Sequence, residues 1–162
     1  MKEKLKSAIE AVLGFGIIFL ILLLISFYVK GIIWIADNVL DWLFIIMWIV
    51  FALNIIILLP LFLIKKTRTA SAIGLHISSY IYGMTLWFWG LIITYIVWGG
   101  FAVFLGLFLL GGGVVPIAIL ASIINGQWAV AGELFFLIIL TFGTRIISNI
   151  VLDSYEQTEY YY

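Results

Sequence analysis

Arg145 is the side chain with the highest expected free-energy cost of insertion into a membrane, because it lies within an apolar segment near the C-terminus. In hydrocarbon, an arginine at the centre of a helix costs roughly 2.5–3.5 kcal/mol unless it is paired or hydrated. Thr141 and Ser148 share its helical face at spacings of three and four residues, and Asn149 adjoins that face. Such a polar stripe can bind an anion, gate a pathway or move a proton, or it can lock helices together.

Other polar side chains in apolar segments are candidate partners for this arginine. Asn54 lies in a long apolar run and is typical of a hydrogen bond between helices. His76, the only histidine, follows a basic run by a turn or two and is expected to pack at the membrane interface. Glu133 lies one turn into the last apolar segment and is expected to cap the positive end of that helix, with a proton carrier as the alternative. The candidate partners are Asn54, His76, Ser78, Ser79 and Glu133.

A stretch rich in glycine, with one proline, interrupts the fourth apolar segment. Because proline removes one backbone donor and clashes with the carbonyl four residues earlier, we predict a kink or break. Some transporters use broken helices to expose carbonyls to an ion or substrate, and the alternatives are a structural kink and a re-entrant loop. No Lys-Ser or Lys-Thr follows the glycines, so the stretch is not a phosphate-binding loop. The residues of the predicted break are Gly111, Gly112, Gly113 and Pro116.

Small residues recur at a spacing of four along two segments, a pattern typical of close helix packing in lipid. We expect these faces to pack within one chain, with an oligomer interface as the alternative. One face comprises Ala70, Gly74 and Ser78, and the other comprises Ala118, Ser122 and Gly126.

The composition places all these residues in a membrane. Apolar residues make up 66% of the 162 residues and charged residues 10%, with a mean hydropathy of +1.31. An average soluble domain is about 45–50% apolar and about 25% charged. The eight basic and eight acidic residues cancel, which argues against a nucleic-acid partner. Because there is no cysteine and one histidine, we expect no enzyme, no metal site and no cofactor.

Five apolar segments are each long enough to cross a hydrocarbon core of about 30 Å at 1.5 Å per residue. We therefore predict an all-α integral membrane protein, a polytopic bundle of five transmembrane helices over residues 1–152. A short acidic, tyrosine-rich tail follows over 153–162. The alternative has four spans plus a re-entrant fourth segment. The predicted spans are 12–29, 42–64, 73–97, 101–124 and 129–152, with connections at 31–41, 65–68, 98–100 and 125–127.

The basic residues indicate an orientation, because short loops rich in lysine and arginine stay in the cytoplasm. Three lysines precede the first span and the basic run 65–68 follows the second, so both are predicted to be cytoplasmic. With five spans, the C-terminus lies on the opposite side. The first apolar stretch is longer than the ~7–15 residues of a signal-peptide core and lacks an Ala-x-Ala site, so we expect it to be retained.

These features favour two kinds of function. In the first, the chain is a subunit of an oligomeric channel or transporter for an ion or small solute, with the glycine-proline break and the Arg145 stripe lining its pathway. In the second, it is a non-catalytic accessory or scaffold subunit of a larger membrane complex, and the same residues hold helices together. The expected partners are the lipid bilayer and either further copies of the chain or other membrane subunits.

Overall fold

The computed structural model describes the backbone of residues 2–64, 66–109 and 111–159, and the side chains of residues 14–64, 66–109 and 111–153. These residues form helices joined by short turns, with no strand among them, so the predicted all-α class is confirmed. Three of the described helices are long and apolar enough to cross a membrane. The count of five crossings stays a prediction.

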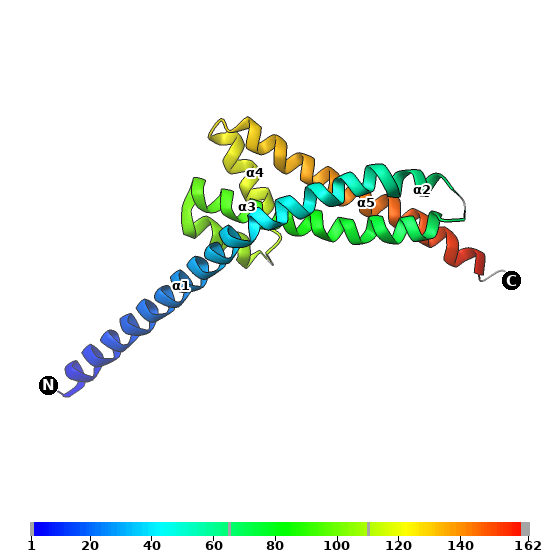
Figure 1. Cartoon of the computed structure of the whole chain (residues 1–162). Coiled ribbons are helices and arrows are strands. Elements are labelled where there is room, and N and C mark those ends of the chain that lie inside the picture. Colours follow the sequence, from blue (N-terminus) through cyan, green and yellow to red (C-terminus); the bar gives the residue numbers. More distant parts are fainter. Residues whose placement is uncertain (1, 65, 110, 160–162) are drawn as a thin grey trace.

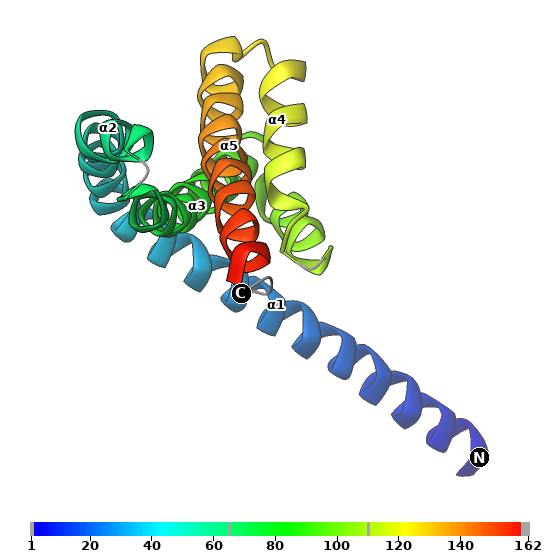
Figure 2. The same ribbon diagram turned by 90° about the vertical axis from the view of Figure 1, so that its right-hand side faces the viewer.

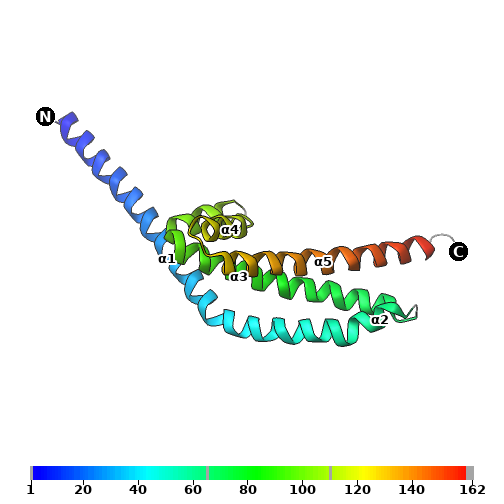
Figure 3. The ribbon, with the colours of Figure 1, turned by 90° about the horizontal axis from the view of Figure 1, so that it is seen from above.

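The first helix, α1, runs without interruption from Lys2 to Leu53 (Figure 1). It includes the segment 31–41, which the sequence predicts as a connection between two spans. That segment holds no proline, and the side-chain amide of Asn38 donates to the Trp34 carbonyl one turn earlier, at 2.7 Å, so its polar residues do not end the helix. The N-terminal part of α1 extends away from the other helices as an arm, which Figure 3 shows from above.

A wide helical turn follows α1 and accommodates a proline. The π-helix Asn54–Leu58 leads into the short helix α2, Leu59–Leu63, whose second residue is Pro60. In a regular α-helix the proline ring would clash with the carbonyl four residues earlier. The Leu59 amide instead donates to the carbonyl of Asn54, five residues earlier, and this wider turn leaves room for the ring.

Three long helical segments make up the bundle, and the second of them in chain order runs antiparallel to the other two (Figures 1 and 2). They are the second half of α1, the first part of α3 (Arg68–Phe108) and α5 (Trp128–Glu159). Their shared core is apolar and buries Met47 from α1, Tyr82 from α3 and Leu134 from α5. At one end, Ser148 Oγ on α5 donates to the main-chain carbonyl of Ala72 on α3 at 2.7 Å.

The predicted fourth span folds as a hairpin of two short helices. The chain reverses at Gly99, where φ is +80°, so the turn predicted at 98–100 falls at this residue. Residues 100–108 then run back along α3, and α4 (Val114–Ile124) returns to the same end. At 1.5 Å per residue the two arms are about 13 and 16 Å long, so neither crosses a core of about 30 Å alone.

Glycine rather than proline makes the break at the tip of this hairpin. Gly111 has φ of +72°, a left-handed conformation that glycine adopts at little cost, and Gly112 and Gly113 complete the turn. Pro116 is the third residue of α4, in the first turn, where an amide has no partner within the helix. The prediction that Pro116 breaks the helix is therefore wrong, although a break lies where the sequence places it.

The turn predicted at 125–127 joins α4 to α5. Gly126 has φ of +71°, and the Gln127 amide donates to the Ser122 carbonyl at 2.8 Å, a common way to close a helix C-terminus. From there α5 returns through the bundle and ends at the same end as the turn between α2 and α3 (Figure 1). Its helix continues into the predicted tail as far as Glu159, and residues 160–162 lie outside the described residues.

Candidate functional site: a carboxylate in an aromatic cavity

Glu133 is the only acidic residue between Asp41 and Asp153, and it faces a cavity. The cavity has a volume of about 360 Å³ and lies between α1, α3 and α5. A carboxylate in an apolar bundle is costly, so it calls for a chemical partner. The residues that line the cavity are Phe44, Met47, Trp48, Trp89, Glu133, Phe136 and Leu137.

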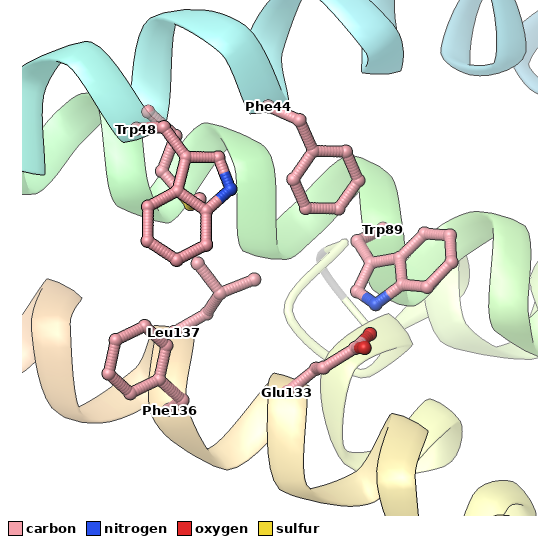
Figure 4. Close-up of a pocket in the computed structure, with 7 residues that line it drawn as sticks. Phe44, Trp48, Trp89, Glu133, Phe136 and Leu137 are labelled. Atoms are coloured by element: carbon pink, nitrogen blue, oxygen red, sulfur yellow. The ribbon is translucent and has the colours of Figure 1, made fainter.

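The indole of Trp89 faces the Glu133 carboxylate across this cavity (Figure 4). Trp89 Nε1 is buried and has no hydrogen-bond partner within the described part of the chain. A buried donor left without an acceptor costs about 1–3 kcal/mol. An acidic group and an unpaired indole N–H thus meet in one cavity whose other lining residues are apolar.

Aromatic rings form much of the cavity wall. Phe44 packs edge-to-face against Trp89, with ring centroids 5.5 Å apart and planes at 76°. Phe136 lies in the same way against Phe51, at 6.0 Å, and the exposed ring of Trp48 closes the outer rim. Aromatic faces attract cations by about 0.5–2 kcal/mol each, and a carboxylate adds a full negative charge. The arrangement is therefore suited to a small cation that also carries apolar groups.

The expected capping role of Glu133 is wrong. Helix α5 begins at Trp128, five residues before Glu133, and no described main-chain amide donates to its carboxylate. The side chain points into the cavity instead (Figure 4). The isolated acidic residue in an apolar segment was the signal for this site, whereas its aromatic neighbours come from helices that only the fold brings together.

Arg145 contacts an aromatic ring that the sequence did not indicate. Its guanidinium carbon lies 4.9 Å from the ring centroid of Tyr80 on α3, and His76 packs edge-to-face on the same ring at 5.4 Å. Within the described residues, no carboxylate lies at ion-pair distance from Arg145. Glu133 is twelve residues away on the same helix, about 18 Å by helical rise. The arginine and the glutamate therefore occupy separate sites.

Asn54, a second candidate partner of the arginine, belongs to another network. Its side-chain amide donates to the Tyr82 hydroxyl at 2.7 Å, and its side-chain oxygen accepts from Ser78 Oγ at 2.9 Å. All three side chains are buried, and they join the π-helix to α3. Asn54 thus links two helices and makes no contact with the arginine.

The predicted polar stripe on α5 does not face one surface. Thr141 is buried, and its hydroxyl donates to the Leu137 carbonyl at 2.7 Å. Ser148 is also buried and bonds to α3 through Ala72. Asn149 is exposed. The Ser148 hydroxyl therefore joins two helices, whereas the Thr141 hydroxyl bonds within α5. Of the stripe, only Thr141 and Arg145 line a common groove.

The two small-residue faces pack mainly within the chain. An added Cβ at Gly74 would lie 2.9 Å from a methyl carbon of Leu58, and Ala118 lies opposite Gly90. Two members do not pack against another helix in this way: Ala70 is exposed, and Gly126 lies in the turn between α4 and α5. The buried members are Ser78, Ala118 and Ser122.

The glycine turn of the hairpin is fastened to α3. Trp87 Nε1 donates to the Gly111 carbonyl at 2.8 Å, and Thr94 Oγ1 donates to the Val114 carbonyl at 3.2 Å. A second cavity, of about 590 Å³, lies beside this turn and includes Gly112 and Pro116. Its lining residues are all apolar, so it has no charged side chain to bind a ligand, unlike the cavity at Glu133.

Comparison with known proteins identifies no relative of this chain. No family model matches it, and neither does any curated protein or any solved structure. The geometry of the cavity at Glu133 is therefore the basis for a functional assignment.

Proposed function

We propose that the chain is an oligomeric channel- or transport-type membrane subunit for small cations, with the cavity at Glu133 as its binding site. The observation that carries this proposal is the Glu133 carboxylate pointing into a cavity walled by the aromatic rings of Phe44, Trp48, Trp89 and Phe136. A protein that used Glu133 only to hold helices together would pair it with a donor from its own chain. Among the described residues, none does so.

The proposed membrane arrangement has three crossings by the bundle and a re-entrant hairpin over 100–124. Each hairpin arm is about half as long as a hydrocarbon core is thick. The tip is fastened at Trp87, eleven residues before Trp98, and both hairpin ends lie at one end of the bundle. Irregular backbone at this depth is tolerated when protein covers it or when it lines a cavity. This arrangement supports a re-entrant fourth segment over a crossing one. Because α1 is continuous, the arrangement has three crossings where the sequence-based alternative has four.

The cavity is accessible from outside the bundle. Glu133, Trp48 and Phe136 are all exposed, so a solute can reach the carboxylate without the bundle opening. Glu133 lies about 8 Å along α5 from Trp128, which marks the membrane interface by its type and position. The site is thus shallow on the side where the hairpin enters. An adjoining copy of the chain would complete a path across the rest of the bilayer.

Binding and flux of tetraethylammonium test this function in the full-length protein. Glu133→Gln keeps the shape of the side chain but removes its charge, and should weaken binding about tenfold, or 1.4 kcal/mol. Trp89→Phe should weaken it less, because the ring remains. The matched control is Asp153→Asn, at the far end of the same helix. Uptake into proteoliposomes should follow binding in each variant.

The proposal fails if Glu133→Gln and wild type bind tetraethylammonium equally, or if no cation moves under any imposed gradient. Thermal unfolding of each variant in the same detergent separates loss of the site from loss of the fold.

A second candidate function, an accessory subunit, is favoured by the N-terminal arm of α1. Large apolar side chains from Phe15 to Leu24, and again at Phe27 and Tyr28, are exposed, and few described residues cover this arm. A helix that is apolar on all sides requires apolar surroundings, either lipid or another chain. Photo-crosslinking from a probe at Ile21 in native membranes would identify a stoichiometric partner. Crosslinks to lipid alone would remove this candidate.

A further inference from the structure

We propose a second site, in a groove between α3 and α5, which binds an anionic phospholipid with its phosphate at Arg145 and an acyl chain along the rest of the groove. The groove lies between α3 and α5 and has a volume of about 440 Å³. It is separate from the cavity at Glu133 and does not depend on the cation-binding proposal. Its lining residues are Ser79, Tyr80, Gly83, Met84, Trp87, Phe88, Thr141 and Arg145.

The charge of Arg145 is not neutralised within the described part of the chain. The guanidinium packs against the Tyr80 ring at 4.9 Å, and this contact orients it while leaving its N–H donors free for an anion. Arginine binds phosphate through two parallel hydrogen bonds, which a single point charge cannot match. The site therefore presents a positioned donor pair without an acidic partner.

The depth of Arg145 fits a lipid phosphate. The hydrogen bond from Ser148 to Ala72 sets the two helices in register, and Arg145 is three residues deeper along α5. This places it level with about residue 75 of α3, about 10 Å by helical rise from Arg68 at the basic end. A long arginine side chain covers part of that distance by reaching toward the interface. Its head group then lies at the border between acyl chains and phosphates.

The rest of the groove suits an acyl chain. Met84 and Tyr80 are exposed on its outer side, and Trp87 and Phe88 form its floor with rings 5.1 Å apart at 81°. Trp87 directs its only polar atom away to the Gly111 carbonyl, so it offers no polar group to a ligand. A phosphate at one end and an apolar trough running toward the membrane centre match one phospholipid molecule.

Native mass spectrometry of the full-length protein with added phosphatidylglycerol or phosphatidylcholine tests this site. We expect wild type to retain one phosphatidylglycerol that Arg145→Gln binds about fivefold more weakly, from about 1 kcal/mol per basic residue. The matched control is Arg68→Gln. Arg68 lies at the same end of the bundle, with its guanidinium 5.0 Å from the Phe62 ring and outside the groove, and its substitution should change little. Arg145→Lys should recover part of the binding.

A second variant keeps the test valid if Arg145→Gln folds poorly. Met84→Trp leaves the arginine intact and fills the groove from an exposed position, so it should also reduce phosphatidylglycerol binding. Equal binding of phosphatidylglycerol by wild type, Arg145→Gln and Met84→Trp would overturn the proposal. It would also be overturned if inorganic phosphate alone stabilised wild type over Arg145→Gln as well as phosphatidylglycerol does, because the acyl chain would then play no part.

Discussion

Trp87 on α3 donates from Nε1 to the main-chain carbonyl of Gly111, at 2.8 Å, and so fastens the tip of the hairpin to the bundle. The two residues lie on either side of the turn at Gly99, and their contact sets how deep the hairpin reaches. Thr94 makes a weaker contact nearby, with Oγ1 3.2 Å from the Val114 carbonyl. The Gly111 carbonyl lies in the glycine break, outside the helices, and would otherwise lack a partner in hydrocarbon, whereas Val114 is the first residue of α4.

Trp87→Phe should weaken the attachment of the hairpin to α3 while a ring still fills the position of the side chain. The phenyl ring still packs, but the Gly111 carbonyl loses its donor, so the free energy of unfolding should fall by about 1 kcal/mol. Denaturant titration in mixed micelles measures this loss. The control is Trp42→Phe, whose exposed ring should tolerate the change. Equal stability of the two variants would mean that the hydrogen bond does not hold the tip.

Gly106→Ala should prevent the close approach of the two hairpin arms. A Cβ at this position would lie 3.0 Å from the Cα of Val114 and 3.1 Å from its amide nitrogen, both main-chain atoms that cannot rotate away. Overpacking of this kind costs about 1–3 kcal/mol. Gly132→Ala on α5 is the control, because nothing lies within 4 Å and alanine favours a helix. The expected result is a destabilised Gly106→Ala and an unchanged or stabilised Gly132→Ala.

The sequence predicted those parts of the fold that depend on local chemistry. The turns at Gly99 and Gly126 were foreseen because each needs a positive φ, which glycine supplies, beside an aromatic residue typical of interfaces. The continuity of α1 through 31–41 was not foreseen. Polar residues between two apolar runs are compatible both with a loop and with a helical turn. The hairpin depends on Gly106 meeting Val114, and that approach is a tertiary contact.

The candidate sites were foreseen only in part, for a similar reason. Arg145 was identified by type, since an isolated charge in an apolar segment is costly, whereas Glu133 was expected as a helix cap or as a partner of the arginine. Their neighbours were not, because Tyr80 and Trp89 lie on α3 and read there as ordinary aromatic packing. A single sequence does not specify which helix faces meet, so it offered Asn54 and Glu133 as partners for the arginine when neither lies beside it.

Asn54 and Tyr82 should show coupled effects on stability. Tyr82→Phe removes the hydroxyl that accepts from the Asn54 amide, and Asn54→Leu removes the amide itself. Each single change leaves a buried polar group without a partner, whereas the double change leaves neither. The double-mutant cycle should give a coupling of about 0.5–1.7 kcal/mol, the range for hydrogen bonds between membrane helices. Additive effects would contradict the proposed link between the π-helix and α3.

The re-entrant hairpin makes a prediction about sidedness that a crossing segment does not share. Because the sequence has no cysteine, each single substitution provides one labelling site without further changes. Trp98→Cys and Gln127→Cys should react with a membrane-impermeant maleimide from one face of oriented vesicles. Thr67→Cys and Asp153→Cys should react from the other face, since α5 ends beside the turn between α2 and α3.

Five crossings would give a different pattern in the same experiment. The fourth segment would then carry the chain across the bilayer, so Trp98 and Gln127 would be labelled from opposite faces, as would Thr67 and Asp153. An added Cβ at Gly106 discriminates further, because a straight crossing helix has room for alanine there and the hairpin does not. If Trp98→Cys and Gln127→Cys react from opposite faces while Gly106→Ala keeps wild-type stability, the segment 101–124 crosses the membrane. In that case the shallow position proposed for Glu133, on the face where the hairpin enters, has to be abandoned.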